Sequence, residues 1–262
     1  GDAVLINKEK KMKAKPVIYK GIKFRSTLEV KHYINMTENY GWEVEYEPEI
    51  EGLYGWLPDF LIKGCKRDIL VEVKPIRSLR EWRNHPDWEK IQDSGIFDFY
   101  ENKPIYDLLI LGATGFLKPD EGLLTFNEKT VIGFYFDMQA EKENEDYIKI
   151  NPEMRGKIGN DFEPAELTYC MNNKKFGFSV CQGQWRDRIN KENWDKPYRF
   201  FDPDQGDWWM DRDDIHDHPL LYNEREYVDQ PFDYELDRDG FINRLNYKWN
   251  QIHSEYQWQP TK

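Results

Sequence analysis

The sequence is poor in cysteine, in long apolar runs and in net positive charge, and each shortage excludes a class of protein. Only three cysteines occur in 262 residues, without the paired spacing of a zinc site. This argues against a disulfide framework and favours a reducing compartment such as the cytoplasm. No apolar run approaches the ~20 residues of a membrane-spanning helix, and the first residues lack signal-peptide order. We therefore expect a cytoplasmic protein with no membrane partner.

The net charge of −12 is unusual for a protein that binds nucleic acid, but the charge is unevenly distributed. Residues 1–25 carry a net charge of +6, whereas residues 202–239 carry −11. Outside residues 202–239 the chain carries a net charge of only −1, so the overall sign does not exclude an anionic substrate. Three regions are expected: a basic flexible arm over 1–16, a compact α/β unit over 17–138, and an acidic, Trp-rich region over 139–262. The last is either an extension of the α/β unit or a second domain.

The hydrophobic pattern predicts alternating helices and strands in the central region. Ser26 begins a helix that Gly41 ends, because Ser26-x-x-Glu29 fits a capping box and one helical face is apolar. A second helix is expected over residues 87–100. Strands are expected over residues 42–47, 56–62, 68–74, 108–111 and 131–136, with a further strand over 176–181 and a closing helix over 241–256. The sequence of strand, helix and buried strand predicts a βαβ crossover.

Two carboxylates meet if the strands 56–62 and 68–74 form a hairpin. Pairing Ile62 with Ile69 places Asp59 opposite Glu72, while Lys74 projects from the same face as Glu72. Two facing acids repel each other unless a cation lies between them. Mg²⁺ prefers such hard oxygen ligands, and the carbonyl of Val73 could add another. Lys74 could then orient or deprotonate a water molecule, or stabilise negative charge on phosphate.

Four segments in this order resemble the PD-(D/E)xK nucleases of phages and mobile elements. They read FRSTLE at Phe24–Glu29, WEVEYEPE at Trp42–Glu49, WLPDF at Trp56–Phe60 and LVEVK at Leu70–Lys74. The chain is similar to the end-cutting endonuclease subunits of some transposons and to Holliday-junction resolvases. Two departures concern the substrate groove: Pro75 follows the lysine where glycine is common, and the segment before the next buried strand is longer.

The resemblance implies an α/β fold with a restriction-endonuclease-like core, in which helices flank a mixed central sheet and an aromatic-rich acidic C-terminal extension follows. It implies that Glu29, Asp59, Glu72 and Lys74 are catalytic and that Asp59 and Glu72 bind metal. The expected cofactor is Mg²⁺, which Mn²⁺ should replace. The expected activity is hydrolysis of phosphodiester bonds in DNA, in the host cytoplasm if the protein is viral.

Several residues have weaker claims to a role. Glu29 could instead cap its helix through the Ser26 amide, and Glu47 could simply face solvent. Gln92 could touch the site or its substrate. The run Asp213–His218 contains two histidines but fits an acidic, solvated loop.

The sequence leaves two other functions open. The chain could be a protein-binding module with a nuclease fold, acting against a host defence or replication factor, with residues 202–239 as its surface. It could also cleave RNA, because a metal site does not distinguish the sugar. A homodimer is compatible with either function.

Overall fold

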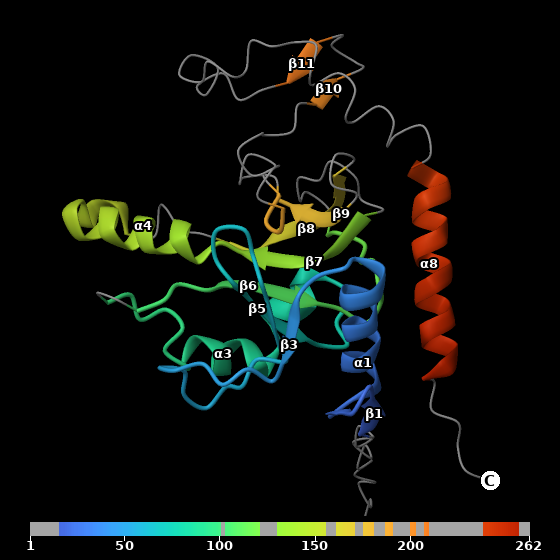
Figure 1. The fold of residues 1–262 in the computed structure, drawn as a ribbon. Helices are drawn as coiled ribbons and strands as arrows, with labels where there is room; N and C mark the ends of the chain where they lie inside the picture. The colour runs from blue at the N-terminus through green and yellow to red at the C-terminus, as the bar shows by residue number, and fades with distance from the viewer. Residues whose placement is uncertain are drawn as a thin grey trace, which may run out of the picture.

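A mixed seven-stranded sheet organises the chain in the computed structural model (Figure 1). The structure describes residues 16–100, 103–120, 130–155, 161–170, 175–180, 187–190, 200–202, 207–209 and 238–256. The sheet has the order β3-β4-β5-β6-β7-β8-β9. Its strands are β3 (Val44–Tyr46), β4 (Phe60–Ile62), β5 (Ile69–Val73), β6 (Asp107–Leu111), β7 (Val131–Phe136), β8 (Glu163–Cys170) and β9 (Lys175–Ser179). The fold is therefore of the mixed α/β type, and the sheet continues past residue 138.

The expected βαβ crossover is confirmed. Strands β5 and β6 pair in parallel, whereas the other neighbouring strands of this sheet are antiparallel. The connection between β5 and β6 carries α2 (Leu79–Arg83) and α3 (Pro86–Gln92). Both strands are buried along their whole length, as the continuous apolar run over residues 108–111 predicts for β6.

Two expected elements are shorter than the sequence pattern suggested. The helix predicted over 87–100 ends at Gln92, because Gly95 takes a φ of +85° that a helix does not permit. The strand predicted from Trp56 begins only at Phe60. The residues before Phe60 form a loop in which the Trp56 indole is buried.

Each face of the sheet carries its own apolar cluster. Helix α1 (Thr27–Ile34) lies on one face, and α8 (Arg238–Glu255) packs alongside it (Figure 1). The closing helix α8 buries Leu245, Trp249 and Ile252, and the Trp249 ring packs on His32 with ring centroids 4.9 Å apart. Helices α2 and α3 contribute Leu79, Trp82 and Ile91 to the cluster on the other face.

Short elements complete the described part of the chain. Strands β1 (Val17–Tyr19) and β2 (Ile22–Phe24) form a hairpin before α1. A π-helical turn η1 (Asn35–Asn39) extends α1, and α4 (Met138–Ile150) follows β7. The remaining elements are η3 (Pro152–Met154) and the pair β10 (Phe200–Asp202) and β11 (Asp207–Trp209). In the part of the chain that the structure describes, no helix is long and apolar enough to cross a membrane.

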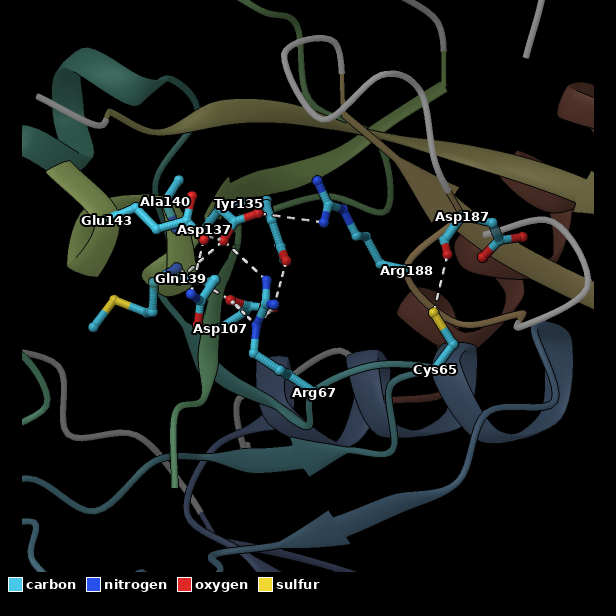
Figure 2. Close-up of polar contacts among 11 residues, drawn as sticks. Cys65, Arg67, Asp107, Tyr135, Asp137, Gln139, Ala140, Glu143, Asp187 and Arg188 are labelled. Atoms are coloured by element: carbon cyan, nitrogen blue, oxygen red, sulfur yellow. Dashed lines mark hydrogen bonds and ion pairs between the residues drawn. The ribbon is translucent and has the colours of Figure 1, made fainter. Parts of the chain in front are cut away.

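A charged cluster fastens the ends of β6 and β7 to neighbouring segments (Figure 2). Arg67 Nε donates to both carboxylate oxygens of Asp107 at 3.0 Å, and its Nη2 lies 2.9 Å from Asp137. Arg188 Nη1 lies 3.3 Å from Asp137, and the Tyr135 hydroxyl donates to Asp107 at 2.6 Å. These ion pairs and hydrogen bonds connect the start of β6 and the end of β7 to the segments that carry Arg67 and Arg188, so we assign the cluster a structural role.

Several predictions fall outside the described residues. They concern the basic arm up to residue 15, the histidines of the run Asp213–His218, and most of the acidic stretch 202–239. The proposed partner surface on that stretch therefore stays a prediction.

Candidate active site at the end of strands β4 and β5

The hairpin register expected from the sequence is confirmed. Ile62 pairs with Ile69, Leu61 with Leu70, and Phe60 with Val71. Asp59 directly precedes this ladder, and its amide donates to the Val71 carbonyl at 3.0 Å. Glu72 directly follows Val71, so the two acids lie side by side at one end of the β4–β5 hairpin.

Both carboxylates are withdrawn from solvent. Asp59 is 3% exposed and Glu72 is 4% exposed, although acids are rarely buried without a compensating partner. Burial, and next the charge of Glu72, raise the pKa of Asp59 to about 7. Burial and the neighbouring acid thus disfavour the ionised form of Asp59, and acids perturbed in this way are typical of sites that act on ligands or substrates.

Each oxygen of the acid pair receives a hydrogen bond. Asp59 Oδ2 accepts from the Val73 amide at 2.7 Å, and Asp59 Oδ1 accepts from Arg25 Nη2 at 2.6 Å. Glu72 Oε2 accepts from the Trp56 indole at 2.9 Å, and Glu72 Oε1 lies 2.7 Å from Lys74 Nζ. Two of these donors belong to buried, rigid groups, and the other two are long cationic side chains.

Lys74 is held between two carboxylates. Its Nζ lies 2.7 Å from Glu72 and 2.8 Å from Asp87, in the first turn of α3. Burial alone would lower the pKa of Lys74, but the nearby charges of Glu72 and Asp87 raise it above its usual value. Lys74 is therefore a fixed ammonium beside the acid pair, suited to attract an anion rather than to remove a proton.

Glu29 lies near the acid pair but contacts it indirectly. Ser26 caps α1 by accepting from the Glu29 amide at 3.1 Å. The Glu29 carboxylate accepts from the Arg25 amide at 3.0 Å, one residue earlier than an ordinary capping box, and from the Tyr46 hydroxyl at 2.8 Å. Its negative charge also contributes to the raised pKa of Asp59. Glu29 therefore supports the site by fixing the backbone of Arg25.

Of the weaker candidates, Glu47 and Val73 contact residues of the site, and Gln92 is exposed to solvent. The backbone of Glu47 takes a left-handed φ of +48°, which is unusual for a residue other than glycine. Its carboxylate lies 2.6 Å from Arg25 Nε. Gln92 ends α3 and is exposed. Val73 contributes its amide to Asp59, while the use of its carbonyl as a metal ligand stays a prediction.

The donor set fits a hard cation such as Mg²⁺. Among the described residues, no three His, Cys, Asp or Glu side chains are grouped closely enough to hold a metal ion. Mg²⁺ does not require such a cage, because it keeps several waters and often binds only one or two protein carboxylates. Asp59 and Glu72 supply those carboxylates, and the guanidinium of Arg25 against Asp59 marks a position where positive charge is already stabilised.

Sequence reasoning missed Arg25, Trp56 and Asp87 as members of the site. Arg25 and Trp56 stand inside the motifs that carried the resemblance, yet nothing in their spacing showed that they bond the acids. Asp87 is far from the motifs and reaches Lys74 only because the crossover returns α3 to this end of the sheet. An acid after His85-Pro86, where a helix begins, was the available signal, and it indicates a cap more readily than a site.

If the site hydrolyses phosphodiester bonds, as the sequence resemblance implies, Asp87→Asn should slow cleavage about tenfold, equivalent to about 1.4 kcal/mol, because Lys74 loses one of its two anchors. Metal binding should be unchanged, since Asp59 and Glu72 are intact. Single-turnover rates and Mn²⁺ titration by calorimetry measure the two effects separately. Asp93→Asn, an exposed change at the end of the same helix, is the matched control. Equal rates for Asp87→Asn and the wild type would contradict a role for Asp87.

Comparisons of the chain with protein-family models, with curated proteins and with solved structures find no match. The function of the chain therefore has to be inferred from the geometry of the acid pair and its surroundings.

Proposed function

We propose that the protein is a Mg²⁺-dependent endonuclease that hydrolyses phosphodiester bonds in DNA. The observation that carries the proposal is the buried pair of Asp59 and Glu72, with Lys74 two residues beyond Glu72. Arg25 and Lys74 offset the repulsion of the buried acids only in part, because burial and Glu72 still raise the pKa of Asp59 to about 7. A bound divalent cation would stabilise the pair further.

The arrangement of elements agrees with the resemblance seen in the sequence. The motif segments follow one another as α1, β3, β4 and β5, and the crossover to β6 makes the sheet mixed. A restriction-endonuclease-like core is accordingly part of the proposal.

The alternative of a protein-binding module depended on acidic residues that mostly lie outside the described part of the chain, so no described feature favours it.

In the proposed reaction each residue has a distinct task. Asp59 and Glu72 would hold Mg²⁺, which when bound lowers the pKa of a coordinated water and withdraws charge from the phosphate. Lys74, fixed by Glu72 and Asp87, places a positive charge where the phosphate becomes more negative during hydrolysis. Trp56 and the Val73 amide fix the carboxylates in a single orientation.

Incubation of the purified protein with supercoiled, linear and single-stranded DNA, and with RNA, tests the proposal. We expect nicking or linearisation of supercoiled DNA with Mg²⁺ or Mn²⁺ and none with EDTA. A Glu72→Gln preparation purified in the same way controls for contaminating nucleases. Failure to cut any DNA with either cation would reject the proposal, and faster cutting of RNA would replace DNA by RNA as the substrate.

A further inference from the structure

The proposed metal site has a positively charged side chain in it already. Arg25 Nη2 lies 2.6 Å from Asp59 Oδ1, the one oxygen of Asp59 that the Val73 amide does not occupy. A metal ion bound to this oxygen would lie within a few ångströms of the guanidinium. Two cations at that distance repel each other strongly in a buried site, so one must leave for the other to bind.

Among the four donors to the acid pair, Arg25 is best placed to move. Each of the two cationic side chains is paired with two carboxylates, but the side chain of Arg25 is 52% exposed and that of Lys74 only 21%. Trp56 and the Val73 amide are part of the buried framework. Displacement of Arg25 therefore requires the smallest rearrangement.

The backbone of Arg25 is fixed by hydrogen bonds, although its side chain is half exposed. Its amide donates to Glu29 at 3.0 Å and to the Tyr46 hydroxyl at 3.0 Å, at the start of α1. The guanidinium is also bound at Nε by Glu47, whose amide donates to the Asp59 carbonyl at 2.9 Å. The side chain can thus swing about a fixed point and remain at the entrance of the site.

We propose that Arg25 occupies the metal-binding oxygen of Asp59 until Mg²⁺ displaces it, and that the released guanidinium then binds a phosphate of the DNA. This inference rests on the proposed nuclease function. Guanidinium groups match phosphate oxygens with paired hydrogen bonds, and the two movements offset each other electrostatically. The free site and the loaded site would each have Arg25 paired with an anion.

The proposal predicts opposite effects of Arg25→Ala on two measurements. Mn²⁺, titrated into metal-free protein by calorimetry, should bind about five- to tenfold more tightly, because no competing cation has to leave Asp59. The single-turnover rate of DNA cleavage at saturating Mg²⁺ should fall about 10- to 100-fold, because a phosphate contact is lost. A side chain with only a structural role would weaken both when removed.

Lys23→Ala is the matched control, since Lys23 is an exposed cation two residues earlier in the chain. The Mn²⁺ titrations of Arg25→Ala and of Lys23→Ala are repeated at about 0.5 M salt, which screens distant charges but not an ion pair in contact. The gain in Mn²⁺ affinity should persist for Arg25→Ala and be absent for Lys23→Ala.

Three outcomes separate this inference from the proposed function. No Mn²⁺ binding by the wild type, together with no cleavage, would reject the nuclease itself. Normal wild-type binding and cleavage with unchanged or weaker Mn²⁺ binding by Arg25→Ala would reject the displacement of Arg25 alone. An equal gain in Mn²⁺ affinity for Lys23→Ala would show that the gain comes from overall charge, and it would also reject the displacement of Arg25.

Discussion

Glu72→Gln and Asp59→Asn should each reduce Mg²⁺-dependent DNA cleavage on the order of 10³-fold or more, because either change removes a metal-binding charge from the site. Lys74→Ala should reduce cleavage on the order of 10²- to 10³-fold while leaving metal binding in place, since it removes only the positive charge beside the phosphate. Single-turnover cleavage of labelled DNA measures all three effects.

The amide variants are chosen because they preserve the shape of each acid and one of its two hydrogen bonds. Gln at 72 can still accept from the Trp56 indole, and Asn at 59 can still accept from the Val73 amide. Glu45→Gln and Lys90→Ala are exposed charge changes on β3 and α3 that serve as controls. Wild-type rates in all three site variants would show that these residues do not catalyse the reaction.

Asp59→Asn should stabilise the metal-free protein at pH 8, even though it abolishes activity. The pKa of Asp59 rises from 3.8 in the unfolded chain to about 7 in the folded protein. A raised folded-state pKa contributes stability that is fully present below pH 4 and is lost as the pH rises through 7. That loss is on the order of 4 kcal/mol at most, and an asparagine at this position avoids it.

Thermal unfolding in EDTA, followed at pH 5 and pH 8, measures this effect. We expect a higher Tm for Asp59→Asn than for the wild type at pH 8, and a smaller difference at pH 5. Each kcal/mol corresponds to about 2–4 °C for a chain of this size. Adding Mg²⁺ at pH 8 should raise the Tm of the wild type and leave that of Asp59→Asn unchanged. A wild-type Tm that does not fall between pH 5 and pH 8, and does not respond to Mg²⁺, would contradict the prediction.

The hairpin that bears the acids was predictable because it depends on local pattern. Only a short connection separates Ile62 from Ile69, and short connections between strands favour an antiparallel hairpin. Matching Ile62 with Ile69 is then enough to place Asp59 beside Glu72. The crossover to β6 was predictable for a similar reason, because a continuous apolar run indicates a strand covered on both faces.

The surroundings of the acids were not predictable, because they depend on contacts between distant segments. Arg25 reaches Asp59 only when the start of α1 packs beside β4, and Asp87 reaches Lys74 only when α3 returns from the crossover. Neither contact has a periodic signature in the sequence. The capping-box alternative for Glu29 was wrong in its partner, since it placed the carboxylate on the Ser26 amide and the structure places it on Arg25 and Tyr46. The expected catalytic role of Glu29 stays a prediction.

The packing of α8 against α1 affects how the protein is made. His32 and Trp249, which pack together, are separated by about 200 residues of chain. Ribosomes add about 5–20 residues per second, so the apolar face of α1 emerges on the order of ten to forty seconds before the helix that covers it. The face of α1 that carries His32 is therefore covered only after α8 has been synthesised, and it stays exposed on the growing chain until then.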